Sequence, residues 1–143
     1  MINSREVSGE WKEFSHKELH EFLNIVSGVN FVMLCSSDGF ELSLASKRNL
    51  DNTGKIAAVS SSILAMVSAF ISEIKLTGCQ TITLEAENGK VFLTSVDIPQ
   101  NPMVLVAVTN KDILMGQMLY HFKKLSGSLS TISMKVSDVS KVI

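Results

Sequence analysis

Two histidines four residues apart, in the stretch HKELH (16–20), have the spacing that most directly suggests chemistry. On a helix, residues four apart share a face, so both imidazoles could ligate one metal ion. The order differs from the metalloprotease motif, because Lys17 and not a glutamate follows His16. A third and a fourth ligand are not evident, and the sequence therefore predicts no metal site.

Cys35, Asp38 and His121 are the residues from which a nucleophile, an orienting acid and a base could be assembled. A thiol inside an apolar strand is usually buried and inert, and Asp38 is explained by a tight turn with Gly39. The chain also has no glycine-rich phosphate loop and no nucleophile elbow. We therefore predict no catalytic residue and no cofactor, which is typical of a protein that is not an enzyme.

Length and composition favour one globular domain. The chain has 143 residues, of which 45% are hydrophobic and 19% charged, and its net charge is −1. That balance offers no electrostatic footprint for a nucleic-acid partner. The charged N-terminal stretch is unlike a secretory signal, so we expect a cytoplasmic protein with Cys35 and Cys79 reduced.

The chain divides into a lead (1–14), a domain (15–127) and a serine-rich tail (128–143) that is either loose or a short added helix. Ser15 and Glu18 have capping-box spacing, which predicts that the first helix begins at Ser15 and ends near Gly28. Apolar residues at helical spacing also predict a last helix after Asn110.

Five strands are predicted between these helices, and they favour an α/β (α+β) sandwich with an antiparallel sheet. The stretches 29–35 and 103–108 are apolar throughout, as in central neighbouring strands, whereas 40–46 and 81–87 alternate, as in edge strands. Counted along the chain, the predicted sheet order is 2-1-5-4-3, with one long helix on one face and two helices on the other. Asp38 and Gly39 form the first hairpin turn. In this order Cys35 and Cys79 lie about 14 Å apart, beyond disulfide reach.

The stretch IAAVSSSILAMVSAFIS (56–72) has no charge, proline or glycine and predicts a helix of about six turns when extended to Lys75. Its serine content and the lack of an aromatic belt argue against a membrane span. On a helical wheel the large side chains fall on one arc, which we interpret as the core face: Ile56, Val59, Ile63, Leu64, Met66, Val67, Phe70, Ile71 and Ile74. The remaining face is small, where a solvated helix normally carries charge, and we interpret it as a partner interface: Ala57, Ala58, Ser61, Ser62, Ala65, Ser68, Ala69 and Ser72.

This layout resembles the Roadblock family of dynein-light-chain-like, GTPase-regulating domains, and the chain looks like a bacterial or archaeal member. The resemblance lies in GVNFVMLCSSDGFELSLA (28–45), AAVSSSILAMVSAF (57–70), LEAENGKVFLTSV (84–96) and VLVAVT (104–109). It implies a homodimer formed by the long helix and the strand after it, which adds Thr81 and Thr83 to the interface. It also implies a small Ras-like GTPase as partner, bound through the paired long helices.

Family members of the Mgl type stimulate hydrolysis by their GTPase without donating a catalytic residue, and the resemblance implies the same here. Two alternatives stay open from the sequence. One is a structural light-chain or scaffold subunit of a motor or multiprotein assembly. The other is a small-molecule sensor, which would need an inward polar cluster that the sequence does not show.

Overall fold

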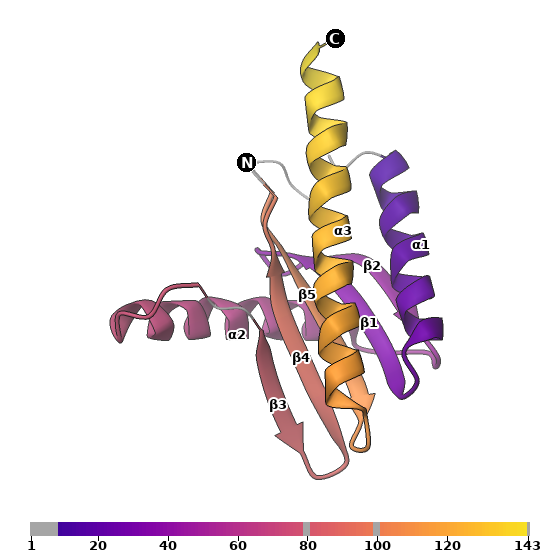
Figure 1. The fold of residues 1–143 in the computed structure, drawn as a ribbon, viewed down its shortest axis with the longest axis vertical. Coiled ribbons are helices and arrows are strands. Elements are labelled where there is room, and N and C mark those ends of the chain that lie inside the picture. The colour runs from indigo at the N-terminus through magenta and orange to yellow at the C-terminus, as the bar shows by residue number, and fades with distance from the viewer. Residues whose placement is uncertain (1–8, 79–80, 99–100, 143) are drawn as a thin grey trace.

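The structure is a computed structural model that describes residues 9–78, 81–98 and 101–142, with the side chains of the last helix described as far as Thr131. The elements along the chain are α1 (Gly9–Ile25), β1 (Val29–Ser36), β2 (Glu41–Ser46), α2 (Thr53–Glu73), β3 (Ile82–Ala86), β4 (Gly89–Val96), β5 (Met103–Asn110) and α3 (Met115–Val142). They form one antiparallel sheet between two helical layers (Figure 1).

The sheet has the order β2-β1-β5-β4-β3, which confirms the predicted order, edges and central pair. Each neighbouring pair is antiparallel, with Val32 opposite Ala107 at the centre and Phe92 opposite the same alanine on the other side. The largely apolar strands β1 and β5 are central because both of their faces are covered, whereas β2 is only partly buried and β3 is exposed on both faces after Ile82.

The first hairpin confirms the predicted turn. Ser36 and Phe40 bond to each other across it, and Gly39 takes a φ of +97°, which glycine adopts without strain. A side chain at Gly39 would also meet the Ala58 Cα at 3.2 Å, so this turn lies directly against α2. The turn therefore joins the hairpin to the long helix.

Helices α1 and α3 cover one face of the sheet together, and α2 alone crosses the other (Figure 1). The two-helix side holds the larger core, which includes Leu19, Phe22, Phe92, Met118 and Phe122. The α2 side holds a smaller core around Met33, Cys35, Leu93 and Val106. Cys35 is a free, buried thiol, and its predicted non-partner Cys79 lies outside the described residues.

The start of α1 differs from the prediction. The helix begins at Gly9, six residues before Ser15, and the buried Ser15 hydroxyl donates to the Lys12 carbonyl at 3.0 Å instead of capping the helix. The reason is Trp11, which is only 2% exposed and continues the buried stripe of Leu19 and Phe22 by another turn. Burial of this indole outweighs the local capping signal.

The predicted segment boundaries at 14 and 127 therefore fall inside helices. Residues 9–14 of the lead belong to α1, while 1–8 lie outside the described residues. The serine-rich tail continues α3 to Val142, and its first turns still pack on the domain, because Leu129 is fully buried. In Figure 1 α3 continues past the end of the sheet and of α1.

Candidate partner interface on the long helix

The long helix α2 contacts the sheet with both small and apolar side chains, which confirms one part of the predicted core face and corrects the other. Its buried residues are Ala57, Ser60 and Ser61, and four half-buried apolar residues pack against the same core: Ile56, Ile63, Leu64 and Val67. Small residues let the helix come close to β1 and the β1–β2 turn, as the approach of Ala58 to Gly39 shows. The wheel was right for Ile56, Ile63, Leu64 and Val67, and it was wrong for the large side chains that are exposed: Val59, Met66, Phe70 and Ile74.

Ser61 anchors this contact through its hydroxyl. Its Oγ lies 2.9 Å from the Ser36 carbonyl at the end of β1 and 3.0 Å from the Ala57 carbonyl of its own helix. One hydroxyl proton is thus shared between two acceptors in a buried position. The next residue, Ser62, is exposed and bonds only within the helix, to the Ala58 carbonyl at 3.0 Å.

Four large apolar side chains of α2 are exposed instead of buried, and we call them the apolar ridge. Their exposed fractions are 50% for Val59, 65% for Met66, 62% for Phe70 and 48% for Ile74. The spacing of seven, four and four residues places them on one line along the helix. Large apolar side chains in a contiguous row on a surface are typical of an interaction site.

Two of the four ridge residues, Phe70 and Ile74, lie at the C-terminal end of α2, which extends beyond the sheet. In Figure 1 the C-terminal half of α2 projects past β3, the edge strand. From Ser68 to Gly78 every residue is exposed except the half-buried Ile71. We call this segment (68–78) the overhang, and no element of the described chain lies beneath it.

The residues predicted for the interface are distributed over two surfaces. Ala57 and Ser61 lie against the protein's own sheet, so the face assignment was wrong for these two. The other predicted residues of α2 are exposed: Ala58, Ser62, Ala65, Ser68, Ala69 and Ser72. On β3, Thr83 is exposed and Thr81 half-buried. Whether any of them touches a partner stays a prediction, and the sequence analysis missed the apolar ridge as a candidate interface.

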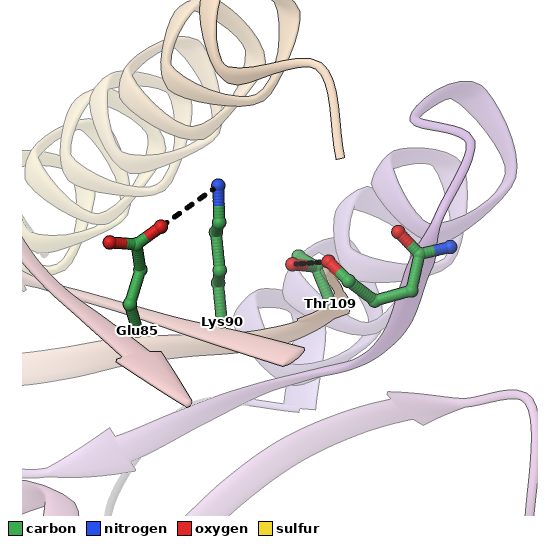
Figure 2. A network of polar contacts seen from close by, with 4 residues as sticks. Glu85, Lys90 and Thr109 are labelled. Carbon is green, nitrogen blue, oxygen red and sulfur yellow. Dashed lines mark hydrogen bonds and ion pairs between the residues drawn. The ribbon is translucent and has the colours of Figure 1, made fainter. Parts of the chain in front are cut away.

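Among the described strands, the edge strand β3 pairs only with β4, and its other edge has no partner strand there. Near its end Glu85 and Lys90 form an ion pair, with 3.5 Å between Oε1 and Nζ, beside Thr109 of β5 (Figure 2). The Lys90 side chain is 15% exposed and the Glu85 side chain 75%. The pair holds the β3–β4 hairpin together on the α3 side of the sheet, and Leu84 points the other way with 42% of its surface exposed.

The residues considered for chemistry do not assemble into a centre. His16 and His20 contact each other edge to face, with 4.3 Å between ring centroids, and the described residues contain no group of three possible ligands. Burial raises the pKa of the Cys35 thiol to about 12, so the thiol stays protonated at neutral pH. Cys35 lies in the core on the α2 side, whereas His121 belongs to α3 on the opposite side of the sheet.

Length and apolar character alone would let α2 cross a membrane: it has 21 residues, and its most apolar window has a mean hydropathy of 1.7. Core helices of folded domains meet the same criterion. Only 17% of that window is buried, which agrees with the exposed apolar side chains of α2 described above. The absence of a membrane span remains a prediction.

Comparisons with known proteins identify this arrangement. Residues 16–108 match the model of the Roadblock/LC7 domain. The gliding protein MglB from Thermus thermophilus has a similar structure, with a TM-score of 0.79 and 17% sequence identity over 90% of this chain and 95% of that one.

Two further solved structures have the same fold. MglB from Myxococcus xanthus gives a TM-score of 0.77 and 16% identity, over 85% of this chain and 96% of that one. A Roadblock/LC7 domain from Streptomyces avermitilis gives 0.75 and 14%, over 83% and 97%. A search by sequence among curated proteins found no match.

Proposed function

Because the chain belongs to the Roadblock/LC7 domain family, we propose that it is a non-enzymatic homodimeric adaptor or regulator of a small Ras-like GTPase. The observation that carries the proposal is the apolar ridge of α2, which continues onto the overhang. The ridge exposes four large apolar side chains that no residue described in the structure covers. A second copy is the occupant that best fits both the ridge and the free edge of β3.

The geometry of the edge supports a two-fold arrangement. If the β3 strands of two copies pair edge to edge, the sheet of the second copy continues past β3, beneath the overhang of the first. By symmetry each ridge then contacts the other copy, so both copies use the same surface and the assembly is complete as a dimer. The exposed Leu84 of β3 lies beside the same junction and adds apolar area.

A face of α2 remains free in this dimer. Ala58, Ser62, Ala65 and Ala69 lie away from both the sheet and the ridge at about 100° per residue. Two such faces side by side offer a shallow surface of small side chains, on which a partner backbone can approach closely. We propose that the GTPase binds there, and that the protein acts by positioning residues of the GTPase, not by supplying a nucleophile.

The homodimer is tested by light scattering on the wild type and on Met66→Glu/Phe70→Glu. We expect a dimer for the wild type and a monomer for the variant, because two carboxylates would have to be buried in the contact. The matched control is Ile25→Glu, which charges a side chain that is 63% exposed at the end of α1, on the other side of the sheet. A monomeric wild type, or a dimer that survives the double substitution, contradicts this arrangement.

The GTPase contact is tested separately with Ala65→Glu, which leaves the ridge intact. We expect this variant to remain a dimer and to lose binding to a small GTPase encoded beside the gene, together with any change in the rate of GTP hydrolysis. A wild-type protein that binds no such GTPase in either nucleotide state favours the alternative, a structural light-chain or scaffold subunit.

A further inference from the structure

A second candidate binding surface lies at the other end of the sheet from β3. It is a hollow of about 340 Å³ on the α2 side, floored by Phe31 of β1, Val108 of β5 and Leu50. Phe31 is 8% exposed, so the floor is nearly buried, while Leu50 and Val108 are half-buried. We call it the Phe31 hollow, and it requires an apolar group to fill it.

Two cations stand at the rim of the hollow. Lys47 and Arg48 are both exposed, and neither forms an ion pair with any residue that the structure describes, the nearby Asp51 included. Side by side, they create a local positive charge in a protein whose net charge is −1. An occupant of the hollow is therefore expected to carry negative charge next to its apolar group.

The backbone that carries the two cations is fixed in place. The Lys47 amide donates to the Asn30 carbonyl at 3.0 Å, and the Arg48 amide donates to the Ser46 hydroxyl at 3.2 Å. The Ser46 hydroxyl in turn donates to the Arg48 carbonyl. Because the turn is closed by these bonds, both side chains start from defined positions beside the hollow, which lowers the entropy lost on binding.

We propose that the Phe31 hollow binds an acidic segment of a partner protein, in which one large apolar side chain is flanked by Asp or Glu. The apolar side chain enters the hollow, and the carboxylates meet Lys47 and Arg48, the guanidinium being able to hold a carboxylate through two hydrogen bonds. The segment can continue along β2, an edge strand whose outer side pairs with no strand in the part of the chain that the structure describes.

Other negatively charged partners fit less well. Recognition of an anionic lipid surface typically needs a cluster of about four to eight basic residues, and the hollow has two. Nucleic acid needs a broader basic surface and offers no apolar side chain to fill the floor. A peptide with alternating acidic and apolar character satisfies both features of the hollow.

The hollow is independent of the proposed dimer. It lies over β2, β1 and β5, whereas the β3 edge and the overhang belong to the opposite end of the sheet. The two surfaces can therefore be occupied together, and each can be removed by substitutions that leave the other intact. This site goes beyond the proposed GTPase contact on α2.

The test uses four acetylated octapeptides in which Phe, Leu, Ile or Met is flanked on both sides by Asp and Glu. Binding is followed by shifts of backbone amide signals in NMR spectra of the full chain. We expect at least one peptide to bind with a dissociation constant on the order of 0.1–1 mM and to shift signals of Asn30, Lys47 and Val108. Matched peptides with Asn and Gln, or with Ala in place of the apolar residue, are expected to bind at least about tenfold more weakly.

Charge reversal localises the site. Lys47→Glu/Arg48→Glu is expected to weaken the binding of the acidic peptides at least about tenfold and to leave the dimer intact. The control, Lys12→Glu/Lys17→Glu on α1, makes the same change in net charge at two exposed lysines and should bind like the wild type. Met66→Glu/Phe70→Glu should also still bind, which separates this site from the dimer.

Three results would overturn the proposal. In the first, none of the four acidic peptides binds. In the second, the neutral peptides bind as well as the acidic ones, or the charge reversal has no effect. In the third, the wild type binds vesicles containing phosphatidylserine through Lys47 and Arg48 but binds none of the peptides, which assigns the cations to a lipid surface.

Discussion

The two faces of the sheet are covered in different ways. On one face α1 and α3 enclose a core in which Phe22, Phe92 and Phe122 are 5% exposed or less. On the other face α2 is a single helix whose only fully buried residues are small. Its apolar contacts with the sheet are half-buried, four of its large side chains are exposed, and it extends past the edge. The difference teaches that stability resides mainly on the first face, whereas the second face is shaped for recognition.

The strongest test of this contrast compares two phenylalanines. Phe122→Ala removes a fully buried ring that contacts the rings of Phe22 and Phe92, and should lower the free energy of unfolding by about 3–5 kcal/mol at every protein concentration. Phe70→Ala removes a ring that is 62% exposed in a single subunit.

The effect of Phe70→Ala should therefore depend on protein concentration, because a dimer contact stabilises only the associated state. Urea denaturation of each variant, carried out at two protein concentrations that differ by about 100-fold, measures the loss of stability for both substitutions. If both variants lost the same free energy of unfolding, independent of protein concentration, the two faces of the sheet would not differ in the way described.

A smaller effect is expected where α2 meets the β1–β2 turn. Gly39→Ala places a methyl group on a residue with φ of +97° and within 3.2 Å of the Ala58 Cα, so it strains the backbone and displaces the helix. We expect a loss of at least about 1–2 kcal/mol in the free energy of unfolding. Gly54→Ala is the control, since nothing lies within 4 Å of the added methyl group there and φ is not positive. A loss no larger than that of Gly54→Ala would show that the turn does not hold α2.

The neighbouring serines of α2 separate its sheet-facing side from its exposed side. Ser61→Ala removes a buried hydrogen bond to the Ser36 carbonyl and should cost about 0.5–1.5 kcal/mol, the Ser36 carbonyl keeping its bond from the Gly39 amide. Ser62→Ala removes an exposed bond within the helix and should be neutral or slightly stabilising, since alanine is the better helix former. Thermal unfolding of both variants gives the comparison, and equal effects would argue that Ser61 does not anchor α2 to the sheet.

The sequence predicts an element of this fold well where its pattern of apolar and polar residues agrees with the way the element packs. In the sheet they agree: apolar runs in β1 and β5 and alternation in β2 and β3 determine the strand order. In α2 they conflict, because the helix has apolar or small residues on every side and the wheel contains no information on which side meets the sheet. The start of α1 was missed for a related reason, since the tertiary burial of Trp11 is not visible in a local capping motif.

The candidate site was predicted only in part for the same reason. The absence of charge predicted that α2 is an interface helix, and the exposure of Ala58, Ala65 and Ala69 leaves this a prediction. That its large side chains form a ridge off the sheet could not follow, because exposure of Met66 and Phe70 is unfavourable for an isolated chain. A sequence read as one monomer assigns such residues to the core.

The smallest expected effect lies at the rim of the covered face and depends on pH. Burial in the groove between α1 and α3, and then the neighbouring Glu21, raise the pKa of Glu18 above its ordinary value of 4.5. As the pH rises above 4.5, the carboxyl ionises first in the unfolded chain, while the folded protein still holds its proton. Folding stability therefore falls through the window between 4.5 and the raised pKa, and the loss persists at higher pH.

Glu18→Gln removes this titration. The variant should gain stability relative to the wild type as the pH rises from about 3 to about 7. Its Tm should be slightly higher than that of the wild type at neutral pH, and this increase should disappear at acid pH. Glu13→Gln, at an exposed position of the same helix, reports the effect of removing one negative charge alone. The prediction is wrong if the difference in stability between wild type and Glu18→Gln stays constant from pH about 3 to about 7. In that case burial does not penalise the Glu18 carboxylate, and the edge of the covered face is as accessible to water as the overhang of α2.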